Sequence, residues 1–172
     1  MRAGLGIFFV AATAFGQTPQ LPTLQVCNGT VVRAAGTVRI DSRVAAGFAG
    51  TVDVKAEITC DPHGTAYPAG TVTLAISLTD AYQGTITMTT LEQVTSTGRV
   101  TPTAYVNGRC KAGEKPIPGC RMWVTFVDNR EPEAKGTPDI LGFLVIDASG
   151  RRVAHGTGPL VKGDIRVGPT PN

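Results

Sequence analysis

The clearest feature of the chain is an alternation of apolar and polar side chains at every second position. It runs through residues 51–59 and 72–78, and more weakly through 85–91. Successive side chains of a β-strand point to opposite faces, so this period predicts strands with one buried and one solvated face. Helical periodicity is nearly absent. The pattern therefore predicts an all-β protein.

Two later segments, 122–127 and 140–146, are apolar at nearly every position. They are rich in β-branched and aromatic residues, which is typical of central strands covered on both faces. We therefore expect Trp123, in the first of them, to lie in the core. Pro102 lies inside a further candidate strand, 99–106, and favours an edge strand or a bulge there.

Together with shorter candidates at 38–40, 152–154 and 164–167, these segments give about nine strands. Gly-Thr pairs at 36, 50, 70 and 84 each precede Val or Ile, and glycine accepts the positive φ of a turn. We expect a turn followed by a strand at each. The fold class predicted is an antiparallel two-sheet β-sandwich, immunoglobulin-like or jelly-roll-like, and the alternative is a closed β-barrel.

The first sixteen residues have the pattern of a secretory signal peptide. Arg2 precedes a short apolar run that ends in small residues, and cleavage is expected after Gly16. The run is shorter than the roughly 20 residues of a membrane span. We expect a secreted, extracellular or periplasmic protein whose residues 17–172 form one domain. In it, 17–26 would be an extended segment and 168–172 a frayed tail.

The chain has four cysteines, and an even number in an exported protein favours disulfides. Cys110 and Cys120 flank a loop rich in Gly and Pro that a disulfide would close. Cys27 and Cys60 would then pair with each other. Three pairings are possible in principle, and the short loop favours this one.

Charge and catalytic motifs restrict the function classes. Removing residues 1–16 leaves a net charge of about +2, evenly scattered, so we expect neither a nucleic-acid partner nor a membrane-surface partner. No serine lies in a Gly-x-Ser-x-Gly turn, and two disulfides would leave no thiol nucleophile. His63 and His155 have neither zinc nor copper spacing relative to the cysteines. We expect no enzyme and no cofactor.

One polar loop offers an exception to that expectation. Residues 128–139 concentrate the hard oxygen ligands that calcium prefers; the candidates are Asp128, Asn129, Glu131 and Asp139. Basic residues lie among them and no spaced Asp pattern occurs, so a solvated, self-paired loop is favoured over a calcium site.

Tyrosines outside the expected core are the remaining candidates for ligand contact, namely Tyr67, Tyr82 and Tyr105. Our first hypothesis is a non-enzymatic module that binds an extracellular macromolecule, protein or polysaccharide, through its loops or a sheet edge. The second is a carbohydrate-binding or carbohydrate-processing module. The third is a structural subunit that assembles by strand addition through 18–26.

Overall fold

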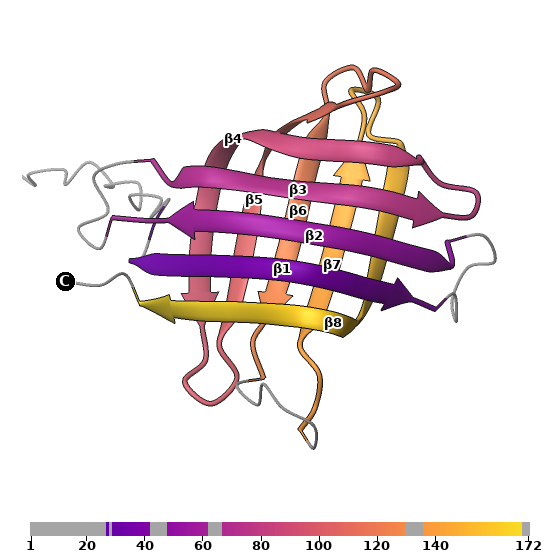
Figure 1. The fold of residues 1–172 in the computed structure, drawn as a ribbon. Coiled ribbons are helices and arrows are strands. Elements are labelled where there is room, and N and C mark those ends of the chain that lie inside the picture. Colours follow the sequence, from indigo (N-terminus) through magenta and orange to yellow (C-terminus); the bar gives the residue numbers. More distant parts are fainter. Residues whose placement is uncertain (1–26, 28, 42–47, 62–66, 130–135, 170–172) are drawn as a thin grey trace, which may run out of the picture.

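The computed structural model describes residues 27, 29–41, 48–61, 67–129 and 136–169. Each of its eight strands pairs antiparallel with the next in sequence, and the last pairs with the first, so the sheet closes into a barrel (Figure 1). The strands are β1 (Thr30–Ile40), β2 (Gly50–Thr59), β3 (Ala69–Leu78), β4 (Gly84–Thr97), β5 (Thr103–Ala112), β6 (Arg121–Val127), β7 (Ile140–Ile146) and β8 (Arg152–Pro169). None of the described residues forms a helix long and apolar enough to cross a membrane.

The predicted all-β class is confirmed, but the β-sandwich is wrong and the alternative, a closed barrel, fits. The barrel resembles a sandwich in its layering. Figure 1 shows that β1–β3 lie in front of β5–β7 and run across them, as the two sheets of a sandwich would. β4 and β8 pass from one layer to the other and join them. A two-residue period in the sequence indicates only that one face of each strand is buried, and this is true of a sandwich and of a closed barrel alike.

β4 and β8 turn these corners through bulges. The pairing of β4 with β5 shifts register twice, after Met88 and after Leu91, and β8 shifts once against β1 and once against β7. A bulge bends its strand and increases its twist. Gly108 and Gly163 lie where a Cβ atom would overlap a backbone oxygen of the neighbouring strand, and Gly163 has φ 105°. Glycine is required there because the backbones approach so closely.

Several predicted strand boundaries change as a result. The candidates 152–154 and 164–167 belong to the single long strand β8, which also takes in Gly168 and Pro169. Residues 99–102 form the turn before β5, so Pro102 is neither in an edge strand nor at a bulge. Three of the four Gly-Thr pairs begin strands with glycine at positive φ, whereas Gly36 lies inside β1.

Apolar side chains fill the inside of the barrel. On β2 the alternation predicted from sequence is confirmed, with Val52, Val54, Ala56 and Ile58 buried. An eight-stranded barrel has an interior just wide enough for side chains to fill. Among the described residues, only Thr30 and Asp128 are both polar and buried. The interior is therefore a hydrophobic core.

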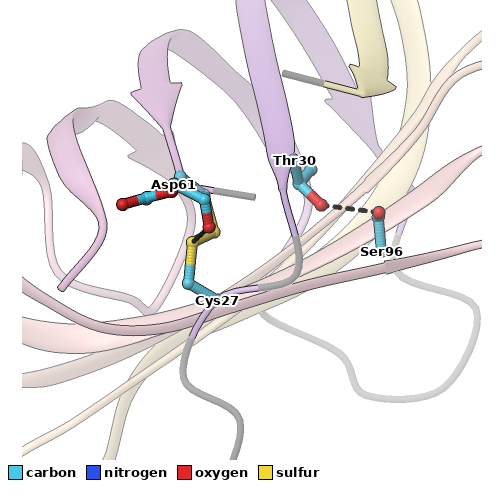
Figure 2. Close-up of a disulfide and its surroundings, with 5 residues drawn as sticks. Cys27, Thr30, Asp61 and Ser96 are labelled. Carbon is cyan, nitrogen blue, oxygen red and sulfur yellow. Dashed lines mark hydrogen bonds between the residues drawn. A yellow bond between two sulfur atoms is a disulfide. The ribbon is translucent and has the colours of Figure 1, made fainter. Parts of the chain in front are cut away.

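Both predicted disulfides are present, Cys27–Cys60 and Cys110–Cys120. Cys27 is fully buried, forms a parallel bridge with Val94 of β4, and is tied to the end of β2 through Cys60. Nearby, the Thr30 and Ser96 hydroxyls are hydrogen-bonded at 2.6 Å (Figure 2). The chain that enters β1 thus fastens β1, β2 and β4 together at one end of the barrel. Residues 1–26 lie outside the described part.

Candidate binding surface

The outer surfaces of the two layers differ in chemistry. On β1 and β2 the outward positions carry Arg33, Asp53, Lys55 and Glu57, all exposed, and the Thr37 hydroxyl donates to Asp53 at 2.6 Å. Alternating charges of this kind make a solvated face. On β5–β7 the outward positions instead include rings and aliphatic side chains. Because apolar side chains fill the interior, the candidate functional site lies on this second outer surface.

The strand register arranges these side chains in rows across the barrel wall. One row runs from Gln93 of β4 through Asn107 of β5 and Trp123 of β6 to Leu144 of β7. The adjacent row places Tyr105 beside Thr125. Directly opposed side chains in antiparallel strands lie about 5 Å apart at Cβ, and diagonal ones about 7–8 Å apart. Tyr105 and Trp123 are diagonal neighbours, so their rings lie within reach of each other. We call these six residues the aromatic face.

Trp123 was predicted to lie in the core, and this prediction is wrong. It is partly exposed on the outside of β6, between the buried residues Met122 and Val124. The outer side of β7 is likewise only partly covered at Leu144, so these strands are not buried on both faces. The outward position of Trp123 could have been predicted from the sequence, because the residues two positions away on the same strand face, Arg121 and Thr125, are both polar.

Two amides lie beside the rings. Asn107 Nδ2 donates to Gln93 Oε1 at 3.1 Å, linking β5 to β4 on the outer surface. An amide side chain has two donor hydrogens and an acceptor oxygen. The bond uses one hydrogen of Asn107 and leaves its Oδ1 and the amino group of Gln93 available to a ligand. Sequence reasoning missed both residues, although Asn107 alternates with the buried Val106 and Gly108.

A positively charged border adjoins the aromatic face. Arg109 of β5 is paired in register with Arg121 of β6. Ile146 of β7 lies between Arg121 and the exposed Arg152 of β8, and is paired with both. Glu92 is bonded to both Arg109, at 3.1 Å, and Arg121. The Arg121 guanidinium carbon lies 5.8 Å from the centroid of the Trp123 ring. Three cations against one anion leave this arginine row, Arg109, Arg121 and Arg152, with net positive charge.

The three predicted ligand-contact tyrosines are not brought together. Tyr105 lies on the aromatic face with half its surface exposed. Tyr67 precedes β3 and is exposed. The Tyr82 hydroxyl accepts hydrogen bonds from the backbone N–H groups of Glu114 and Lys115, at 3.4 and 3.3 Å, and so holds the β5–β6 loop against the β3–β4 turn.

The proposed calcium ligands Asp128 and Asp139 contact backbone amides. Residues 160–169 of β8 pair with β1 and no longer with β7. Its Val167 N–H donates to Asp128 at 3.0 Å, and its Ile165 N–H donates to Asp139 at 2.8 Å. Asp139 also accepts from the Asn129 N–H. These carboxylates therefore satisfy strand amides that would otherwise lack a partner. Glu131 lies outside the described residues, and calcium at this loop stays a prediction.

The turn between β7 and β8, which leads into Arg152, is organised by one carboxylate. Asp147 accepts from the Ser149 hydroxyl at 2.6 Å, from the Arg151 Nε at 3.0 Å, and from both backbone N–H groups. The Ser149 hydroxyl, followed by Arg151, lowers the pKa of Asp147 from 3.8 to about 2, against a smaller opposing effect of burial. The ionised carboxylate is the form that these donors hold.

We expect the order of this turn to depend on pH. A carboxyl group whose pKa is depressed on folding stabilises the fold above its unfolded pKa, near 4, and loses that contribution as pH falls towards about 2. Carbon-13 NMR of the Asp147 carboxyl should give a midpoint near 2, and Ser149→Ala should raise it. A midpoint near 3.8 in the unchanged protein would show that the hydrogen bonds do not form in solution.

Comparisons of the chain with protein-family models, with curated proteins and with solved structures find no match.

Proposed function

We propose that this chain is an exported, non-enzymatic protein that binds an extracellular macromolecule through the aromatic face. The observation that carries the proposal is the position of Trp123 and Tyr105 outside a barrel whose interior is already filled. Tyr105 is half exposed and Trp123 partly exposed, and Trp and Tyr are enriched where partners bind.

Three further features support this proposal. The signal-like residues 1–16 and the two disulfides fit an oxidising compartment outside the cytoplasm. The aromatic face lies on paired strands, which hold side chains more precisely than loops do. Each strand pairs with a neighbour on both sides over part of its length, so binding by a flat outer face has more support than binding by a sheet edge or assembly by strand addition.

The test is retention on material from outside the cell. Labelled, oxidised protein should be retained by intact cells or insoluble extracellular material of the source organism. Replacing either Trp123 or Tyr105 with alanine should weaken retention by about tenfold, since a hot-spot ring contributes on the order of 1–2 kcal/mol. The matched control is Tyr67→Ala, which removes an exposed ring elsewhere. No retention, or equal retention of all variants, would exclude this face as the binding surface.

A further inference from the structure

We infer that the ligand of the aromatic face is an acidic polysaccharide, a polymer of sugars that carry carboxylate groups. The inference rests on the proposed function and adds the chemical class of the partner. It depends on three groups that the barrel register brings side by side: rings, amides and arginines.

The rings supply a surface for the apolar side of a sugar. The face of an aromatic ring carries partial negative charge, and it attracts the weakly positive C–H groups that line one side of a pyranose. Trp123 and Tyr105 lie on adjacent strands at diagonal positions of a single sheet face. Such a flat arrangement can contact successive sugar rings of an extended polysaccharide, whereas a compact ligand is held better by an enclosed pocket.

The amides supply partners for hydroxyl groups. Asn107 and Gln93 are fixed to each other at 3.1 Å, and together they still present an acceptor and donors next to the Trp123 ring. A sugar hydroxyl both donates and accepts, so a neighbouring pair of hydroxyls matches this combination. A purely apolar partner would instead leave the remaining donors and the free acceptor of this amide pair without hydrogen bonds on burial, which is costly.

The arginines favour a sugar that carries negative charge. Glu92 takes one nitrogen of Arg109 and one of Arg121, and each guanidinium has further N–H donors in a planar fork that matches a carboxylate. Arg109 is 71% exposed and Arg121, whose guanidinium lies over the Trp123 ring, is 41% exposed, so both are accessible to a ligand beside Trp123. Arg152 extends the positive border across β8. A neutral polymer would gain little from this row.

The test uses polygalacturonate as the acidic polymer, dextran as the neutral one and single-stranded DNA as a phosphate polymer. Trp123 is the single tryptophan of the chain, so its fluorescence reports on this face directly. Polygalacturonate should change the emission of Trp123 and bind at least about tenfold more tightly than dextran or DNA. Binding should weaken as salt is raised, because surface charges are screened.

Variants separate the contributions. Trp123→Ala and Tyr105→Ala should each weaken polygalacturonate binding about tenfold, as measured by affinity electrophoresis. Arg121→Gln should weaken it and reduce its salt dependence. The controls are Arg33→Gln and Tyr67→Ala, which change exposed residues away from the aromatic face and should leave binding within about twofold. Tyr105→Ala is expected to leave the fold intact, because Tyr105 is already half exposed to water, so weaker binding by this variant would not be due to unfolding.

The outcomes distinguish the inference from the proposed function. Equal binding of dextran and polygalacturonate, preference for DNA, or an unchanged Trp123 emission would overturn the acidic polysaccharide. If retention on extracellular material still depended on Trp123, the proposed function would stand with a different ligand. If neither polymer binding nor retention depended on Trp123, both would fail.

Discussion

Replacing Phe126 with alanine should destabilise the protein by about 3–5 kcal/mol, the usual loss for a large ring removed from a packed core. Phe126 is fully buried on the inner side of β6, between the inward-facing Ala104 of β5 and Leu141 of β7. Truncation would leave a cavity inside a closed barrel, whose wall has little freedom to collapse around it. Urea unfolding of the oxidised protein measures the loss.

The matched control for this substitution is Thr125→Ala. Thr125 is the preceding residue of the same strand and points outwards beside Tyr105. Its removal should change the free energy of unfolding by no more than about 0.5 kcal/mol, as for most surface substitutions. A similar loss at both positions, or a loss below about 1 kcal/mol at Phe126, would show that β6 does not divide a packed inside from an outside.

Removing the Cys27–Cys60 disulfide, by changing both cysteines to alanine, should cost about 4 kcal/mol in the chain-entropy account. The disulfide spans 33 residues, and the cost of leaving the unfolded chain unconstrained grows with that length. It also anchors Cys27, which forms a β-bridge with Val94. Thermal or denaturant unfolding measures the effect.

The second disulfide gives an internal comparison. Cys110–Cys120 spans only 10 residues, and its removal should cost about 3 kcal/mol on the same basis. The longer loop should therefore give the larger loss. Unchanged stability after removal of Cys27–Cys60 would mean that the segment before β1 is not fastened to the end of the barrel.

The local features of the fold could be predicted from the sequence because they depend on near neighbours. The alternation in 51–59 predicts β2 and its buried residues, and the short loop between Cys110 and Cys120 predicts their pairing. Closure could not be predicted in this way. It depends on β4 and β8 bending through bulges and close-approach glycines such as Gly163, and the two-residue period is the same with or without them.

The candidate site was harder to predict for two physical reasons. The apolar composition of its segment predicts a core position for Trp123, although the polar residues two positions on either side mark the outer face of β6. Asp128 and Asp139 lie in a segment rich in oxygen atoms, which offers them as calcium candidates although a solvated, self-paired loop is the favoured prediction. Their actual partners, the amides of Val167 and Ile165, lie on a strand that reaches them only after the barrel has closed.

The filled interior, and hence the outer binding surface, requires the sheet to close into a barrel. Backbone NOE contacts between β1 and β8 test this closure most directly, because those strands are the first and last of the sheet. We expect contacts between Val32 and Val167 and between Ala34 and Ile165, which are paired in the structure. Absence of these contacts, with rapid amide exchange along both strands, would contradict a closed barrel.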